Sequence, residues 1–385
     1  MSGSGRQAKS SDLQSPLGQL QTGGKPFLFN AWYIAAESLE LKGGAIVGRT
    51  LLGKRIAVYR GESGRLVAMD DFCPHRMVPL SLGAVLGDGL RCAYHGAEFG
   101  PDGRCVKVPG QKVPSAQANV KSYPVIERHG YIWVWLGDPA KSPDESSIPD
   151  GFWVSGDDQW VGGYGHMESI RADYQLINDN LFDITHAEFV HPESFGGPEV
   201  QFYRAAKRGS EYVDRGMTFQ IDEKRIRFRT HAARLGADCG PLWRGMLAQS
   251  RGLEEWNEPL EFRMEVFWWA PVYTSFHIMV RPCDEPDTPL VEIYNLHAAI
   301  PETETSSHYF FCSFRNYGDA SMNKGFIDGV SSAFNQDKVL LEAQQKVLGE
   351  RDLFDAKPVS FSGDRLQLEG RRILKQLIQA ERRGE

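Results

Sequence analysis

Two short stretches, FCPHRMVPL at 72–80 and RCAYHGAEFG at 91–100, each contain one cysteine and one histidine. Cys73 and His75 form a C-x-H pair, and Cys92 and His95 form a C-x-x-H pair. Thiolates and imidazoles are the ligands that soft and borderline metals prefer, so two of each in two loops predict a metal site. Such a donor set suits either zinc or an iron–sulfur centre.

The residues around the two pairs favour the iron–sulfur centre. Zinc fingers place their histidines on a helix, and no helical pattern surrounds His75 or His95. In a Rieske [2Fe–2S] centre, two cysteines hold one iron and two histidines hold the other. The pattern CPHR…CAYHGAEFG resembles the Rieske signature and lies in a β-rich stretch of the chain. We therefore expect Cys73, His75, Cys92 and His95 to bind a Rieske cluster.

A second set of metal ligands is predicted farther along, in NDNLFDITHAEFVHPESFGG. His186 and His191 are five residues apart, so a regular helix would separate them by about 140°. A helix end at His191, just before Pro192, would bring the second imidazole back. Two histidines and one carboxylate bind non-haem Fe(II) in oxygenases. Asp337, in the middle of a half-apolar helical stretch, is the expected carboxylate; the alternative is an acid on a solvated helix face.

Composition limits the remaining possibilities. The chain has 385 residues, enough for two domains, with 41% hydrophobic residues and a formal charge of -7. No block of Lys and Arg occurs, which argues against a nucleic-acid partner. No run of eighteen apolar residues occurs, and the polar N-terminal segment lacks the apolar stretch of a signal peptide. The spacing of the six cysteines does not suggest a set of disulfides, which favours a reducing compartment. Together with the lack of apolar runs, this leads us to expect a cytoplasmic protein with no membrane partner.

The pattern of elements divides the chain into three parts. Residues 1–26 read as a disordered tail, and residues 27–140 as a small all-β domain that carries the Cys/His loops. Beyond the Pro/Ser/Asp-rich linker, residues 141–385 combine helical segments with long β-patterned runs, which indicates an α+β fold. Helices are expected over 323–348 and at the C-terminus. No G-x-G-x-x-G motif follows a strand, so we expect electrons to come from another protein.

Taken together, these motifs resemble the terminal oxygenase component of Rieske non-haem iron oxygenases, in the branch of vanillate and dicamba O-demethylases. The resemblance runs from about residue 28 to the C-terminus and includes NAWYIAAES, PETETSSHYFF, FNQDKVLLEAQQ and EGRRILKQLI. It implies an N-terminal Rieske domain followed by a helix-grip type antiparallel sheet with helices. It places the iron ligands on His186, His191 and Asp337. Gln336 stands where the family usually has an acidic residue.

The resemblance also implies an assembly and a reaction. Family members form head-to-tail homotrimers, in which Asp183 would bridge His186 of its own chain and His95 of a neighbour. A ferredoxin, an NAD(P)H-dependent reductase or both would supply electrons. The mononuclear Fe(II) would use O2 to hydroxylate a small aromatic substrate. Where the attacked carbon is a methyl on oxygen or nitrogen, the product collapses and releases formaldehyde.

The substrate-binding residues are predicted from weaker signals. Asn178, His297 and Trp268, or its neighbour Trp269, are the candidates, because they lie near the iron motif or on strands of the second domain. The alternative for Trp268 is a core position. The leading function is oxidative O- or N-dealkylation of an aromatic compound. The alternatives are a ring-hydroxylating dioxygenase that forms a cis-diol, a simple electron-transfer protein and a zinc-stapled binding module.

Overall fold

The structure is a computed structural model. It describes residues 27–141, 145–195, 206–208, 211–213, 217–230, 233–235, 240–361 and 364–384. The tail predicted over 1–26 lies outside the described residues. The described residues form two compact units: residues 41–49 and 55–123 belong to the smaller one, and residues 27–40, 50–54 and 124 onward belong to the larger one. In the described part of the chain, no helix is both long and apolar enough to cross a membrane.

The smaller unit is all β, as its alternating sequence predicts. One four-stranded sheet has the order β2-β3-β4-β9, and a second has the order β5-β6-β7-β8. Tyr59, Met69, Leu90 and Phe99 form a buried core together with the cluster cysteines. The strands of these sheets are β2 (Ile46–Leu51), β3 (Lys54–Arg60), β4 (Leu66–Asp70), β9 (Ser122–Tyr123), β5 (Ala84–Leu86), β6 (Gly89–Arg91), β7 (Glu98–Phe99) and β8 (Cys105–Lys107).

The two ends of the β-rich region, residues 27–40 and 124–140, belong to the larger unit. Strands β1 (Trp32–Glu37), β11 (Tyr131–Trp135) and β10 (Val125–Arg128) form a three-stranded sheet of their own. Aromatic packing explains their placement. The ring of Trp133 lies 5.4 Å from that of Tyr273, whose hydroxyl donates to the Trp32 carbonyl at 2.6 Å.

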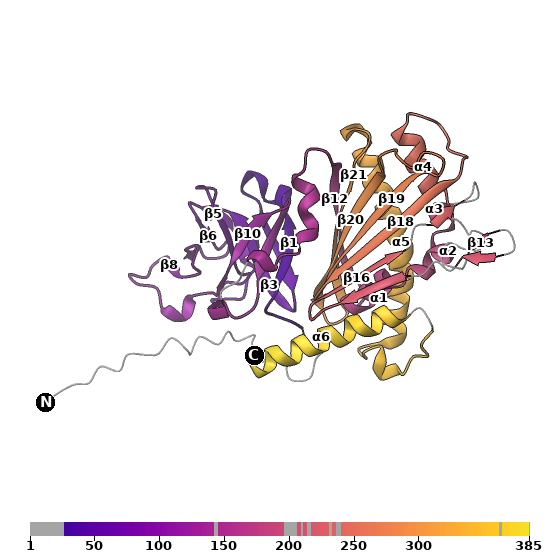
Figure 1. The fold of residues 1–385 in the computed structure, drawn as a ribbon. Helices are drawn as coiled ribbons and strands as arrows, with labels where there is room; N and C mark the ends of the chain where they lie inside the picture. The colour runs from indigo at the N-terminus through magenta and orange to yellow at the C-terminus, as the bar shows by residue number, and fades with distance from the viewer. Residues whose placement is uncertain are drawn as a thin grey trace. The chain divides into compact units, whose positions relative to one another are not determined.

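The larger unit is built on a long antiparallel sheet with the order β12-β21-β20-β19-β18-β16-β15 and β17 beside β18 (Figure 1). The even-numbered residues of β18, from Leu260 to Trp268, are buried on one face, as period-two alternation predicts. The strands are β12 (Val161–Ile170), β15 (Met217–Ile221), β16 (Arg225–Thr230), β17 (Ala233–Leu235), β18 (Leu260–Trp269), β19 (Tyr273–Pro282), β20 (Val291–Thr303) and β21 (Ser306–Arg315); β13 (Ala206–Arg208) and β14 (Glu211–Val213) form a separate hairpin.

Helices complete the larger unit, so the α+β prediction is confirmed. The helix predicted over 323–348 is α5 (Asn323–Leu348), and the predicted C-terminal helix is α6 (Arg365–Arg383). Gly370 lets α6 approach α1, because a Cβ there would lie 2.7 Å from the Phe182 ring. The other helices are α1 (Tyr174–Phe182), α2 (Ala187–Val190), α3 (Pro192–Phe195) and α4 (Pro241–Ser250). Sequence reasoning did not anticipate α4.

Candidate active site with two metal centres

The two Cys/His loops of the smaller unit have the same backbone geometry. The amide of Cys73 donates to the Val78 carbonyl, five residues on, and the amide of Met77 donates back to the Cys73 carbonyl, both at 2.8 Å. In the second loop, Cys92 and Gly96 repeat this pattern at 2.8 and 3.1 Å. The fourth residue after each cysteine has a positive φ, 57° at Met77 and 73° at Gly96. The two loops are therefore paired turns that present their ligands in the same way.

The two turns bury their cysteines and expose their histidines. Both thiols are buried, whereas His75 and His95 are exposed and their rings lie 4.6 Å apart. Burial raises the pKa of the Cys73 thiol; the His75 amide lowers it by donating to the sulfur, and the nearby Cys92 thiol raises it. Two buried free thiols beside two accessible imidazoles fit a [2Fe–2S] group whose irons take different ligands. Cys73 and Cys92 would hold one iron, and His75 and His95 the other.

The second metal site begins where α1 ends. Asp183 caps a short 3₁₀ turn, η8 (Ile184–His186), by accepting a hydrogen bond from the Thr185 amide at 2.9 Å. Helix α2 follows and ends at His191, whose φ and ψ of −124° and 47° are non-helical. This interruption turns the second imidazole toward the first, as the five-residue spacing and Pro192 predict.

The folded chain brings His186, His191 and Asp337 together. One potential ligand atom from each lies within 4.8 Å of the other two. The Nε2 atoms of His186 and His191 are 3.4 and 3.2 Å from Oδ1 of Asp337, which projects from α5. Two imidazoles and one carboxylate on one side of a cavity are the donor set of non-haem Fe(II) oxygenases, so these residues fit that metal.

Electrostatics of the three side chains agree with this role. Burial raises the pKa of Asp337, but hydrogen bonds from the two histidines outweigh it and lower the pKa to about 2. Burial lowers the pKa of His191, yet its hydrogen bonds to Asp337 and Gln336 leave the pKa raised. Asp337 therefore stays ionised, and a proton held by His191 would be released when a cation binds.

Neighbouring polar groups orient the three ligands. Gln336 Oε1 lies 2.7 Å from His191 Nδ1, and Asn180 Nδ2 lies 3.3 Å from Asp337 Oδ1. His186 Nδ1 contacts the main-chain carbonyl of Asp183, and the Asp183 carboxylate instead accepts from Thr185. The expected link between Asp183 and His186 is thus made by the backbone, because the carboxylate is used to cap the turn.

A cavity of about 500 Å³ opens beside the three ligands. Its walls are mainly apolar side chains of α4, α5 and the inner sheet face. On β20, His297 lines it, and His297 Nδ1 lies 2.5 Å from the Tyr309 hydroxyl. Burial lowers the pKa of His297 to about 3, so the imidazole is neutral at pH 7. The lining includes Leu242, Trp243, Met246, Met264, Phe276, Ile278, Ile293, Asn295, Tyr317 and Phe334.

Two predicted substrate residues do not line this cavity. Asn178 donates instead to the Pro271 carbonyl at 3.1 Å. Asn180, two residues farther along α1, points about 200° away from Asn178 and contacts the ligand Asp337. Trp268 shares the inner face of β18 with Met264 but lies beyond the cavity, packed against Phe182. The α4 residues of the lining were missed; Pro241 at the first turn of that helix was the available signal.

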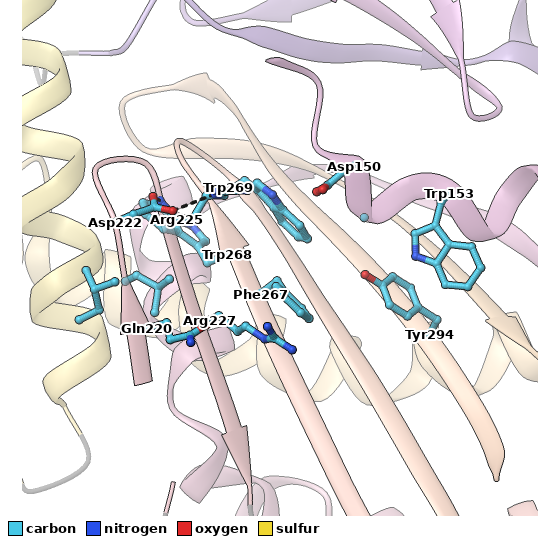
Figure 2. Close-up of a pocket in the computed structure, with 13 residues that line it drawn as sticks. Asp150, Trp153, Gln220, Asp222, Arg225, Arg227, Phe267, Trp268, Trp269 and Tyr294 are labelled. Carbon is cyan, nitrogen blue, oxygen red and sulfur yellow. Dashed lines mark hydrogen bonds and ion pairs between the residues drawn. The ribbon is translucent and has the colours of Figure 1, made fainter. Parts of the chain in front are cut away.

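Trp268 and Trp269 line a different hollow in the larger unit, of about 370 Å³ (Figure 2). Both arginines of its lining are paired: Arg225 donates to Asp222 at 2.9 Å, and Arg227 donates to Glu265 at 2.8 Å while stacking on Phe267. None of the three iron ligands borders it. We therefore place the chemistry in the first cavity.

Comparisons with known proteins agree with both centres. Residues 31–124 match the Rieske [2Fe-2S] domain, and residues 170–380 match the vanillate O-demethylase oxygenase C-terminal domain. The chain is 34% identical to the iron–sulfur subunit of the toluene-4-sulfonate monooxygenase system of Comamonas testosteroni, over 93% of this chain and 99% of that one. It is 32% identical to the oxygenase component of dicamba O-demethylase from Stenotrophomonas maltophilia, over 92% and 99%.

Solved structures give the same result. Dicamba monooxygenase bound to 3,6-dichlorosalicylic acid superposes with a TM-score of 0.77 and 32% identity, over 93% of this chain and 99% of that one. The same enzyme with non-heme iron and dicamba gives a TM-score of 0.72 and 31% identity, over 94% and 100%. This chain therefore belongs to the Rieske non-haem iron oxygenases, as an oxygenase component of the vanillate and dicamba O-demethylase branch.

Proposed function

We propose that this protein is the terminal oxygenase of a multicomponent monooxygenase that hydroxylates an alkyl carbon on the oxygen or nitrogen of an aromatic compound. The observation that carries the proposal is the position of His186, His191 and Asp337 at the wall of a mainly apolar cavity of about 500 Å³. That volume suits a single substituted aromatic ring. Ring dihydroxylation would use the same ligands and is tested by the products.

The cofactors would supply the difficult chemistry: His186, His191 and Asp337 would hold the Fe(II) for O2 activation, and the two Cys/His loops would hold the cluster that supplies electrons. For a methyl ether, the balance is one ether, one O2, one NAD(P)H and one proton giving a hemiacetal, water and NAD(P)+. The hemiacetal then breaks its C–O bond, leaving a phenol and formaldehyde. No protein nucleophile is needed for this collapse.

The cavity residues would orient the substrate and exclude water. Tyr309 is buried and stacks on Phe334 with ring centroids 3.5 Å apart, so its hydroxyl is held against His297 Nδ1. A hydroxyl that donates to Nδ1 places the imidazole proton on Nε2. His297 would then offer one N–H donor to a polar substituent, while Phe276, Ile278 and Ile293 hold the ring by apolar contact.

The known relatives support this substrate class. Dicamba and vanillate O-demethylases carry the activity in their names, and a chloroacetanilide N-alkylformylase is 31% identical over 93% of this chain. Toluene-4-sulfonate carries its methyl group on the ring, where hydroxylation leaves an alcohol and releases no formaldehyde. The monooxygenase of that system defines the second candidate, a benzylic hydroxylase.

The proposal includes a head-to-tail homotrimer and separate electron donors. His95 is exposed, and Asp183 is half-buried with Thr185 using only its Oδ1 atom, so Oδ2 remains available to a neighbour's His95. In a closed ring of three subunits, every Asp183 can pair with the His95 of a neighbouring subunit. A ferredoxin or an NAD(P)H-dependent reductase would feed the cluster, and we propose a cytoplasmic location, where NAD(P)H is available.

The test is a panel of methoxy-, N-alkyl- and ring-methyl aromatics incubated with O2, NADH and a reductase that reduces the cluster. Stoichiometric formaldehyde would support dealkylation, benzylic alcohol alone would support the second candidate, and a cis-diol would contradict both. Asp183→Asn should keep both metals and lose most turnover, and full turnover would contradict the proposed bridge. Sedimentation of the native enzyme tests the trimer.

A further inference from the structure

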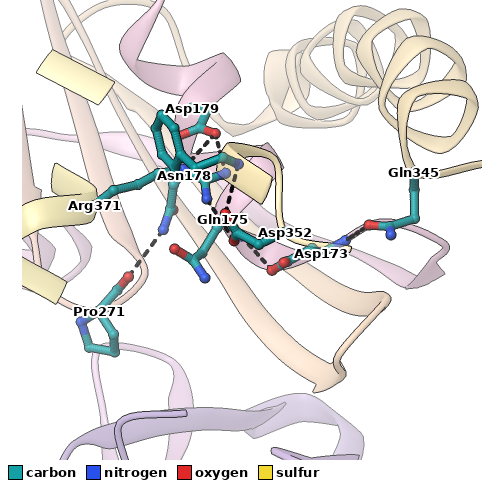
Figure 3. Close-up of polar contacts among 9 residues, drawn as sticks. Asp173, Gln175, Asn178, Asp179, Pro271, Gln345, Asp352 and Arg371 are labelled. Atoms are coloured by element: carbon teal, nitrogen blue, oxygen red, sulfur yellow. Dashed lines mark hydrogen bonds and ion pairs between the residues drawn. The ribbon is translucent and has the colours of Figure 1, made fainter. Parts of the chain in front are cut away.

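The iron ligands come from two helical segments that are distant in the sequence. His186 and His191 follow α1, whereas Asp337 lies on α5. The distance between these segments decides whether the three ligands can meet at one metal ion. A third helix, α6, contributes no ligand, yet one of its side chains contacts both α1 and the segment that follows α5 (Figure 3).

That side chain is Arg371. Its Nε atom is 3.0 Å from both carboxylate oxygens of Asp179, and its Nη2 atom is 2.5 Å from Oδ2. Its Nη1 atom donates to Asp352 at 3.1 Å. Asp179 lies on α1, and Asp352 follows closely after Leu348, the last residue of α5. One guanidinium therefore joins α1 to the end of α5.

The junction is shielded from water. The side chains of Arg371 and Asp179 are 9% and 10% exposed, and the Phe354 ring covers the guanidinium at 5.0 Å. Burial raises the pKa of Asp179 to about 6 against the opposing effect of Arg371, so the carboxylate is ionised at neutral pH. A bidentate pair between two ions in such surroundings fixes geometry more strictly than an exposed pair does.

The contact is also close to the metal ligands along the chain. Asp179 precedes Asn180, which contacts Asp337, and the Asp179 carbonyl accepts from the amide of Asp183, the cap of the turn that holds His186. The opposite end of α1 is tied to α5 separately, where the Asp173 amide donates to Gln345 at 2.9 Å. The two ties lie at the two ends of α1.

We propose that Arg371 is a positioning residue for the mononuclear iron site: it holds α1 against the end of α5, so that the histidines and Asp337 are prearranged for the metal. The inference rests on the proposed iron site and is independent of the substrate. The guanidinium touches none of the three ligands, so its effect would pass through Asp179 and α1.

The test measures Fe(II) binding by chelator-treated enzyme that retains its cluster, together with the EPR spectrum of the nitric oxide complex of the bound iron. Arg371→Met should weaken Fe(II) binding by about 10- to 100-fold, the range seen when groups that orient metal ligands are lost. Arg371→Lys should recover part of the affinity. Arg372→Met is the matched control, because Arg372 is the next residue on α6, is 52% exposed and pairs with Glu369.

A second variant guards against misfolding of the first. Asp352→Asn keeps the buried Arg371–Asp179 pair and removes only the charge that ties Arg371 to the segment after α5. The Asp352 side chain is 29% exposed. The variant should fold and still weaken Fe(II) binding several-fold. A lower melting temperature with unchanged Fe(II) affinity and EPR signal in both variants would overturn the proposal. Failure of the wild-type enzyme to bind this iron would instead overturn the proposed function.

Discussion

The Nδ1 atom of His191 lies 2.7 Å from Oε1 of Gln336, the residue that precedes Asp337 on α5. Two consecutive residues of one helix thus serve the same histidine, one through each ring nitrogen. Gln336 fixes which imidazole nitrogen carries the proton and leaves Nε2 free for a metal. The Gln336 amide thus accepts the hydrogen bond at a position where the family usually has an acidic residue.

Replacing Gln336 by Leu should therefore lower Fe(II) affinity by about 10- to 100-fold. Gln336→Glu should bind iron about as tightly as the wild type, because a carboxylate accepts the same hydrogen bond. Fe(II) titration of chelator-treated enzyme measures both. Asn335→Leu, on the exposed neighbour, is the control. Equal affinity in Gln336→Leu and Asn335→Leu would show that the hydrogen bond does not matter.

Tyr309→Phe should raise KM by about 10-fold and change kcat less, with the methoxy-aromatic that releases formaldehyde fastest. Loss of the hydroxyl frees His297 Nδ1, and the imidazole can then change tautomer and stop donating from Nε2; one hydrogen bond is worth about 1 kcal/mol or slightly more. Steady-state formaldehyde kinetics provide the measurement. An unchanged KM would show that His297 does not bind substrate through this proton.

His297 should also make the protein less stable in acid. Its pKa is about 3 in the folded chain and about 6.5 when unfolded, so only the unfolded state takes up the proton between these values. The stabilisation is complete above pH 6.5 and is lost as the pH falls, by about 1 to 2 kcal/mol at pH 5. His297→Gln has no imidazole at this position to take up a proton on unfolding. Its unfolding midpoint should therefore fall less than that of the wild type between pH 8 and pH 5; parallel curves would contradict the assignment.

His95→Cys should shift the visible spectrum of the cluster and lower its reduction potential by at least about 100 mV, since a thiolate adds negative charge where an imidazole is neutral. A redox titration followed by visible spectroscopy and EPR makes the measurement. Tyr94→Phe is a suitable control because its ring lies beside His95, 3.9 Å away, without being a ligand. An unaltered spectrum in His95→Cys would remove His95 from the ligand set.

Local patterns were sufficient to predict most of the architecture. Cys73, His75, Cys92 and His95 stand out because their spacing and flanking residues describe two turns, and turn geometry is a local property. The end of the helix at His191 follows from its distance to His186 and from Pro192. The helix α5 is predicted to its observed ends because its amphipathic pattern is long and uninterrupted.

Positions that depend on tertiary packing were harder to predict. Asn178 and Asn180 are both polar residues of α1, and only the orientation of that helix decides which one faces the iron ligands. Trp268 lies on a strand, as predicted, but it does not line the cavity and packs against Phe182. Arg371 gives no signal in the sequence, because its partners Asp179 and Asp352 become neighbours only after folding.

The most direct test of the account is a count of iron and acid-labile sulfide in purified wild-type protein and in Asp337→Ala. A [2Fe–2S] cluster plus one mononuclear iron predicts about three irons for every two sulfides in the wild type. The variant should keep the sulfide and the cluster spectrum and fall to about two irons. Zinc in place of iron, a lack of sulfide, or the same iron-to-sulfide ratio in both proteins would contradict the presence of two cooperating iron centres.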